Sequence, residues 1–277
     1  MRVREGDEWK TAFRCREGHY EYVVYPQGAT NALACFQYFM NDIPKEYLDV
    51  ICVGLPDDVI IFSEDPSQHV AHVRSILQVL RENKLYAKVQ KCEFNREQMT
   101  FVGYMVSLAG IDMDPAKIKS ILEWPVPTSV KEVQSFLGFA NFYRKFIDSY
   151  SRLAAPLTTL TIKSVRFTWS NAAAAAFRSL QQAFTTASIL RHYQPDLPLT
   201  VEADASDFAL GCVLSQPSAD GHLHPLCFYN MKFTSAELNH PIYDKELLAL
   251  VAAFKQWRVY MEGAAHPVRV FSDHKNL

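Results

Sequence analysis

LTVEADASDFALGCVLS, residues 199–215, is the stretch that decides the fold class. In its first half, LTVEAD, apolar and polar residues alternate, which is the period of a β-strand with one buried face. Apolar runs at 209–215 and 223–230 follow after short turns. They predict two more strands in quick succession.

A long helix is expected next, at about residues 242–261, because Thr234 and Glu237 form a capping box ahead of it. A fourth strand is predicted at 268–272. Three strands, a helix and a fourth strand are typical of the opening of an α/β domain. If the helix is a right-handed crossover, the first and fourth strands are parallel and their ends lie together.

Three acidic residues fall at informative places in this arrangement. Asp204 ends the first strand, Asp273 follows the fourth strand, and Glu246 lies on the apolar stripe near the start of the helix. An acid on a buried stripe is costly unless it is paired or binds a metal. Carboxylates converging at strand ends could hold two Mg²⁺ ions and activate a water for phosphodiester cleavage. A plainer interpretation makes the aspartates turn residues and Glu246 a solvated helix acid, and spacing alone favours it.

The middle of the chain is predicted to be helical. The proline-rich segment WPVP, residues 124–127, marks a boundary, and Ser129 with Glu132 forms a capping box that opens a helix. Another helix begins at about Ala172, with Ser170 or Asn171 as its cap, and its run of alanines favours helix strongly.

The first hundred residues mix short strands and helices. Two apolar strands at 49–55 and 59–63 flank Pro56-Asp57-Asp58, which predicts a β-hairpin. Helical spacing is present at 31–40 and again from Ser67. A further hairpin is expected from 101–106 to Ile111, with its break at Ala109-Gly110.

The hairpin tip supplies a second candidate metal site. Asp57 and Asp58 project beyond the predicted sheet, which suits a Mg²⁺-bound triphosphate. The alternative is an ordinary turn, and without further context it is the better explanation.

Two segments are candidates for binding nucleotides or nucleic acid. Gln27 and Gly28 form a bend ahead of a helix, where glycine permits close backbone approach, although a plain helix entry explains the pattern too. The stretch 81–96 interleaves basic and aromatic residues and could follow a phosphate backbone or be a solvated face. Its lysines are Lys84, Lys88 and Lys91. His69 and His72 could bind a metal, but a solvent-facing helix is the simpler explanation.

Composition narrows the class of protein. The 277 residues are 49% hydrophobic and 21% charged, the balance of a soluble globular protein. No apolar run is long enough to span a membrane, and the N-terminus lacks a signal core, so an intracellular protein, cytoplasmic or nuclear, is expected. Six scattered cysteines indicate reduced thiols rather than disulfides. With a net charge of −2, nucleic acid would have to be met by a local basic surface.

Taken in order, several long motifs resemble the reverse transcriptase and ribonuclease H of a gypsy-type LTR retrotransposon polyprotein. The resemblance covers essentially the whole chain. Its motifs are EGDEWKTAF (5–13), TNALACFQ (30–37), KLYAKVQKCEF (84–94), FVGYMVSLAGIDMDPAKI (101–118), VQSFLGFANFYRKFI (133–147), EADASDFALGCVLSQ (202–216), YDKELLALV (243–251) and SDHKNL (272–277).

The resemblance implies a domain organisation and a chemistry. Residues 1–123 correspond to a partial α+β palm leading into the thumb, 124–195 to thumb or connection helices, and 196–277 to a partial ribonuclease H-like α/β domain. Asp57 and Asp58 match the paired polymerase aspartates, and Gln27 with Gly28 matches the nucleotide-contacting loop. Three of the four ribonuclease H carboxylates are matched by Asp204, Glu246 and Asp273.

The same resemblance implies Mg²⁺ (or Mn²⁺) as cofactor and an RNA template, DNA primer, deoxynucleotides and RNA–DNA hybrid as partners. Phosphate contacts are expected from the three lysines above and from Arg144 and Lys145. The inherited function is RNA-directed DNA synthesis with removal of the RNA strand. No expectation about oligomeric state follows.

Departures from the family pattern put activity in doubt. Leu55 stands where the family has a tyrosine, and Pro56 follows it. The first polymerase aspartate and the fourth nuclease carboxylate belong outside the sequence, so both domains are expected to be truncated and primer extension by the chain alone is not expected. The alternatives are a non-catalytic nucleic-acid-binding remnant, an inactive relic, or a hydrolase retaining only ribonuclease H.

Overall fold

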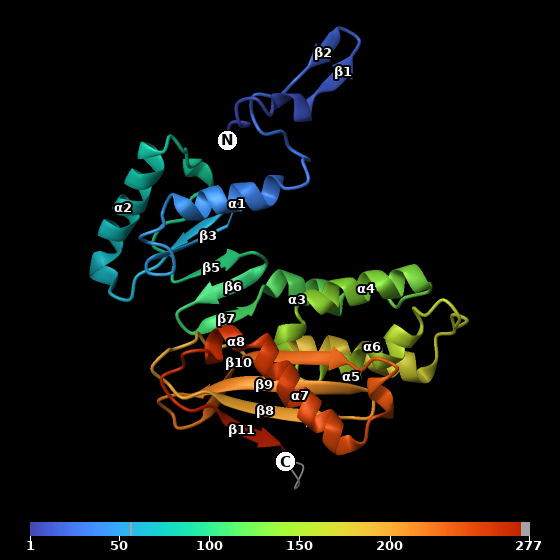
Figure 1. Ribbon diagram of the computed structural model, residues 1–277. Coiled ribbons are helices and arrows are strands. Elements are labelled where there is room, and N and C mark those ends of the chain that lie inside the picture. Colours follow the sequence, from blue (N-terminus) through green and yellow to red (C-terminus); the bar gives the residue numbers. More distant parts are fainter. Residues whose placement is uncertain (56, 273–277) are drawn as a thin grey trace. The chain divides into compact units, whose positions relative to one another are not determined.

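The computed structural model describes residues 1–55 and 57–272 (Figure 1). The chain divides into two compact units, Met1–Phe94 and Asn95–Leu277, and each is described by itself. The domain boundaries expected at 123/124 and 195/196 both fall inside the second unit. They remain predictions, because the division into two compact units does not distinguish palm, thumb and connection.

The first unit contains short elements around a small core. Its hairpin is antiparallel as predicted, with β3 (Cys52–Gly54) paired to β4 (Val59–Ile61). Cys52 and Ile76 are fully buried in its core. The other elements are the 3-10 turns Glu8–Thr11, Pro66–Gln68 and Val89–Lys91, strands β1 (Phe13–Cys15) and β2 (Gly18–Tyr20), and helices α1 (Ala32–Asp42) and α2 (His69–Glu82).

The second unit begins with a three-stranded antiparallel sheet. Its strands are β5 (Gln98–Phe101), β6 (Tyr104–Ser107) and β7 (Gly110–Met113). The turn at Ala109-Gly110 is confirmed, but the single strand expected at 101–106 is wrong. Val102 and Gly103 have positive φ angles of 51° and 81° and form a tight turn inside it. A valine rarely adopts a positive φ, so Val102 gave no reason to predict a turn inside this apolar run.

Helices α3 (Pro115–Leu122), α4 (Val130–Phe142), α5 (Tyr150–Thr159) and α6 (Asn171–Thr185) follow the sheet. Both predicted caps are present: the Ser129 hydroxyl accepts from the Glu132 N–H at 3.3 Å, and the Ser170 hydroxyl accepts from the Ala173 N–H at 3.2 Å. Ser170 is therefore the cap of α6, and Asn171 is its first helical residue.

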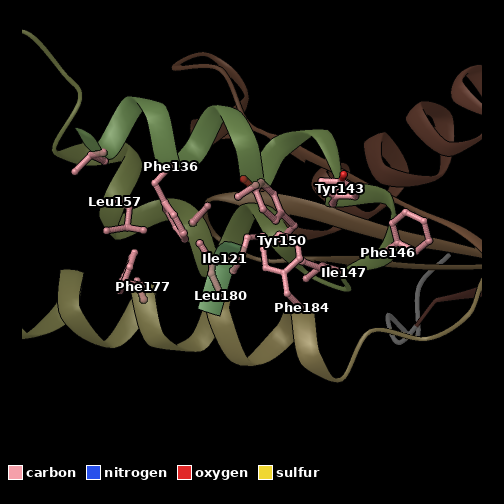
Figure 2. Packing of buried hydrophobic residues seen from close by; sticks show 14 of the residues in the cluster. Ile121, Phe136, Tyr143, Phe146, Ile147, Tyr150, Leu157, Phe177, Leu180 and Phe184 are labelled. Atoms are coloured by element: carbon pink, nitrogen blue, oxygen red, sulfur yellow. The ribbon is translucent and has the colours of Figure 1, made fainter. Parts of the chain in front are cut away.

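The helices pack through a large aromatic and aliphatic core (Figure 2). Phe136 of α4 and Phe177 of α6 have ring centroids 4.6 Å apart, and Leu157 of α5 lies beside them fully buried. The 3-10 turn Arg144–Phe146 adds Phe146 to the same core. The apolar stripes of three helices thus meet in one layer, as ridges packing into grooves require.

The last part of the chain is the predicted α/β arrangement. Its sheet has the order β10-β9-β8-β11 among the described residues. The strands are β8 (Thr200–Ala205), β9 (Ala209–Pro217), β10 (Leu223–Lys232) and β11 (Arg269–Ser272), and β11 pairs parallel to β8 while the other pairs are antiparallel. The parallel pairing of the first and fourth strands is therefore confirmed.

Helix α7 (Ile242–Gln256) packs on one face of this sheet and α5 contacts the other (Figure 1). The helix expected at 242–261 is interrupted at Trp257, which is buried against Tyr229 and precedes the short α8 (Arg258–Met261). The capping box at Thr234 forms, with the Glu237 carboxylate accepting from the Thr234 N–H at 2.7 Å. It opens the 3-10 turn Glu237–Asn239, however, and not α7.

The segment that joins the two sheets is fastened by backbone bonds. Ile111 and Leu190 exchange N–H···O bonds of 2.7 and 2.9 Å. Gly110 has φ of +141°, and a Cβ at this residue would overlap the Leu190 carbonyl oxygen. Glycine at residue 110 therefore permits this close approach.

Candidate functional site

Glu246 lies on the inward face of α7, where its carboxylate contacts the last residues of β8 and β11. Its side chain is 2% exposed. One carboxylate oxygen accepts from the Ala205 N–H at 3.0 Å, and the other accepts from the Ser272 hydroxyl at 3.3 Å. A buried acid is tolerated here because both oxygens accept hydrogen bonds. Glu246, which the sequence places on the apolar stripe of the helix, thus faces the end of the strand that carries Asp204.

Asp204 is exposed near the end of β8, opposite Gly211 of β9 in the strand register. It lines a small recess with Ser149 and Arg152, which come from the start of α5, and with Asn230 of β10. The Asn230 amide donates to the Ile147 carbonyl at 3.2 Å, which ties this edge of the sheet to the helical layer. Asp204 is therefore accessible to solvent and next to basic and polar groups.

The two acids share an electrostatic environment at Cys212. This buried thiol of β9 donates to the Ala249 carbonyl of α7. Burial raises its pKa to about 12, and the negative charges of Glu246 and Asp204 act in the same direction. Both carboxylates are therefore close enough to the same point in the sheet for their charges to act together.

Asp273, the third predicted acid, lies outside the described residues. Ser272, the residue before it, ends β11 and bonds to Glu246. Whether all three carboxylates converge thus remains a prediction. Within 1–55 and 57–272, no group of three or more His, Cys, Asp or Glu residues is arranged to hold a metal ion.

One residue of this region escaped the sequence reasoning. Lys245 is only 5% exposed, and its ammonium donates to the Asp207 carbonyl at 3.3 Å. It also lies 5.7 Å from the centre of the Phe233 ring. The signal available in the sequence was its position beside Glu246, at the start of a helix where a cation is disfavoured.

The second acidic pair, Asp57 and Asp58, is exposed where the β3–β4 hairpin turns. The Leu55 N–H donates to the Asp58 carbonyl at 2.8 Å and closes the hairpin. Pro56 lies outside the described residues. Both carboxylates are thus presented at the end of a hairpin, as the sequence predicted.

Gln27 and Gly28 are exposed in a turn from Pro26 to Ala29, ahead of α1. Gly28 has φ of +92°, a conformation that favours glycine. No ligand contact follows from this geometry, so nucleotide binding by these residues stays a prediction.

Lys84, Lys88 and Lys91 are all exposed, in a mostly irregular segment after α2. Tyr86, in the same segment, is 94% exposed. The segment therefore presents three cations and an aromatic ring to solvent, the combination that single-stranded nucleic acid binding uses.

Arg144 is exposed and Lys145 is half-buried, and the phosphate contact expected of each stays a prediction. The Lys145 ammonium lies 3.8 Å from the centre of the Tyr104 ring, and burial lowers its pKa. This cation–π contact joins the Arg144–Phe146 turn to β6. Arg144 and Lys145 are neighbours in the sequence, and only the packing shows that their surroundings differ.

His69 and His72 are half-buried, and both contact the Ser63 hydroxyl through Nδ1, at 3.0 and 2.8 Å. Both histidines lie on a helix, as expected, but they do not face solvent fully, because their rings contact Ser63, which follows β4.

Comparisons with known proteins agree with this architecture. A family model described as reverse transcriptase (RNA-dependent DNA polymerase) matches residues 1–106. Another, described as an RNase H-like domain found in reverse transcriptase, matches residues 169–270. The chain therefore belongs to the reverse transcriptases that carry a ribonuclease H-like domain.

Within that class, the similar curated proteins are retrotransposon polyproteins. The Transposon Tf2-3 and Tf2-7 polyproteins of Schizosaccharomyces pombe are each 40% identical to it over 277 residues, which is 100% of this chain and 21% of theirs. The predicted resemblance to a gypsy-type polyprotein is confirmed. The chain spans about a fifth of the length of these relatives.

Two solved structures have the same fold at 23% sequence identity. The foamy viral protease-reverse transcriptase in complex with RNA/DNA hybrid has a TM-score of 0.84, covering 100% of this chain and 37% of that one. The same viral protein in complex with dsDNA has a TM-score of 0.81, covering 99% and 56%. Among the described residues, no helix has the length and apolarity needed to cross a membrane.

Proposed function

We propose that the ribonuclease H-like part of the chain hydrolyses the RNA strand of an RNA–DNA hybrid with divalent cations, Mg²⁺ or Mn²⁺. The observation that carries this proposal is the position of Glu246. A carboxylate is held at the ends of two parallel strands, beside the residue that precedes Asp273 and near Asp204. Convergence of acids at strand ends is what two-metal hydrolysis requires.

The donor set suits a hard cation. Asp204 and Glu246 offer carboxylate oxygens, the ligands that Mg²⁺ prefers. Glu246 accepts hydrogen bonds from one N–H and one O–H group, so its orientation is fixed before any ion arrives. The combined negative charge that acts on Cys212 is a further reason to expect a cation here. Asp273 is proposed as the third ligand.

Bound cations would supply a water of lowered pKa and neutralise charge on the phosphate. The protein groups then have distinct tasks. Glu246 and Asp204 would hold the ions through their carboxylate oxygens. Arg152, which lines the same recess as Asp204, would attract the phosphate backbone of a hybrid.

For the first unit we propose the substrate-binding role of the family's polymerase, without primer extension by the chain alone. Asp57 and Asp58 would hold the Mg²⁺-bound deoxynucleotide, and the Gln27–Gly28 turn would contact it. The RNA template and DNA primer would lie along Lys84, Lys88 and Lys91. The foamy viral relatives in fold were solved with RNA/DNA hybrid and with dsDNA, which supports nucleic acid as the partner.

The nuclease proposal is tested by cleavage of labelled RNA in a hybrid, with Mg²⁺ or Mn²⁺ added to metal-free protein. We expect metal-dependent cleavage that Asp204→Asn reduces to background. The matched control is Glu202→Gln, because Glu202 is exposed on the same face of β8 two residues earlier. Equal loss in both variants would contradict a specific role for Asp204. Binding of hybrid without cleavage in any metal would favour the non-catalytic alternative.

A further inference from the structure

The turn after Asp204 is held by two consecutive residues of α7. Glu246 accepts from the Ala205 N–H, on one side of the turn, at 3.0 Å. Lys245 donates to the Asp207 carbonyl, on the other side, at 3.3 Å. An acceptor and a donor from one helix thus contact the chain two residues apart, directly after Asp204.

Burial of Lys245 has a physical cost that packing alone does not justify. The side chain is 5% exposed, and an ammonium loses hydration when it is buried. It also lies in the first turns of α7, where the helix dipole disfavours a positive charge. Methionine would fill the same space without either penalty. The contacts that offset the cost are the Asp207 carbonyl and the Phe233 ring.

The rest of the turn depends on the same small region. The Ser206 hydroxyl donates to the Ala209 carbonyl at 2.8 Å, and the Ala209 N–H donates back to it at 3.2 Å. The Phe233 N–H donates to the Phe208 carbonyl at 3.1 Å. Lys245 contacts the Phe233 ring as well as Asp207, so its ammonium joins the turn to the chain that follows β10.

We infer that Lys245 is a positioning residue that fixes the 205–209 turn and thereby orients the Asp204 carboxylate for a divalent cation. The effect on the cation rests on the proposed function, whereas the hold of Lys245 on the 205–209 turn does not. Lys245 itself contacts neither the cation nor the substrate in this assignment. It acts through the Asp207 carbonyl and the Phe233 ring.

The test compares Lys245→Met with Lys245→Arg, which keeps a charged donor. Lys255→Met is the matched control, because Lys255 is exposed in the last turn of the same helix. Two quantities are measured on the full chain: amide hydrogen exchange across residues 205–209, and the dissociation constant for Mn²⁺ from its paramagnetic resonance spectrum. Asp204→Asn is included to locate the Mn²⁺ site.

We expect Lys245→Met to speed exchange in the turn by about tenfold or more, as loss of a charge-assisted hydrogen bond does. It should also weaken Mn²⁺ binding severalfold, while Lys245→Arg recovers most of both and Lys255→Met changes neither. If Lys245→Met does not fold, Lys245→Gln takes its place with the same expectation.

Unchanged amide exchange in the turn of Lys245→Met would overturn the inference at any measured Mn²⁺ affinity. Faster exchange with unchanged Mn²⁺ affinity would overturn the positioning role and leave Lys245 purely structural. If the parent chain binds no Mn²⁺, or Asp204→Asn binds it equally well, the proposed metal site fails and the positioning role fails with it. The exchange data would still decide whether Lys245 holds the turn.

Discussion

Gly110 shows how one residue can set the approach of two distant segments. Its φ of +141° and its contact with the Leu190 carbonyl leave no room for a Cβ. We expect Gly110→Ala to lower the free energy of unfolding by more than about 3 kcal/mol, because strain and overlap add.

Urea unfolding measures this cost against Gly221→Ala as control. Gly221 also has a positive φ, of +77°, but a Cβ added to it would meet nothing within 4 Å. Its substitution should cost only about 1 to 2 kcal/mol. Equal costs at the two glycines would show that Leu190 moves aside easily.

Cys212 and Cys227 should contribute to the loss of stability at alkaline pH. Burial raises the pKa of each thiol to about 12, from an ordinary value of 9.0. In the unfolded chain the thiols ionise near pH 9, whereas in the folded chain they stay protonated. Their contribution to stability is therefore complete below pH 9 and is lost as the pH rises from 9 toward 12.

Urea midpoints on either side of pH 9 measure this loss. Cys212→Ala should flatten the alkaline decline, and Cys15→Ala should leave it unchanged because Cys15 is exposed. Asp204→Asn should lower the pKa of Cys212, since it removes a negative charge that raises it. An alkaline decline equally steep in the Cys212→Ala variant would assign it to other groups.

At the scale of elements, the start of α6 shows which of two adjacent residues, Ser170 or Asn171, is the N-cap; the sequence allowed either. The Ser170 hydroxyl accepts from the Ala173 N–H, while Asn171 is already helical. We expect Ser170→Ala to cost about 1 kcal/mol of stability. Asn171→Ala should change it by less than about 0.5 kcal/mol. Urea unfolding of both variants decides, and a larger loss at Asn171 would move the cap.

At the scale of the whole molecule, hybrid binding should depend strongly on salt. We expect sequence-independent binding of RNA–DNA hybrid with a dissociation constant of about 10⁻⁴ to 10⁻⁶ M. The net charge of −2 places it at the weak end of that range. Replacing Lys84, Lys88 and Lys91 together by alanine should reduce both the affinity and the salt slope, the slope by about 0.9 for each phosphate that is no longer neutralised.

Titration at roughly 50 and 200 mM salt spans the range where the effect is large. The control is a triple alanine variant at Lys117, Lys131 and Lys163, which are exposed lysines of the second unit. Similar losses in the two triple variants would mean that total charge matters rather than the 81–96 segment. Absence of binding by a folded chain would favour the inactive relic.

The sequence by itself determined the elements whose signals are local. The alternation at 199–205, the caps at Ser129 and Ser170, and the Asp57-Asp58 hairpin needed only neighbouring residues. The order of the elements also predicted that the first and fourth strands are parallel, and the ordered motifs predicted the family.

Only the tertiary structure decided which polar side chains are buried and what they hold. Lys145 lies on the Tyr104 ring, Lys245 holds the turn after Asp204, and Glu246 bonds to Ala205. The partners are 41, 38 and 41 residues away in these three contacts, as the residue numbers show. No local pattern encodes such distances: a lysine in a sequence has the same propensity whether its ammonium meets water, a ring or a carbonyl, and only packing selects among them.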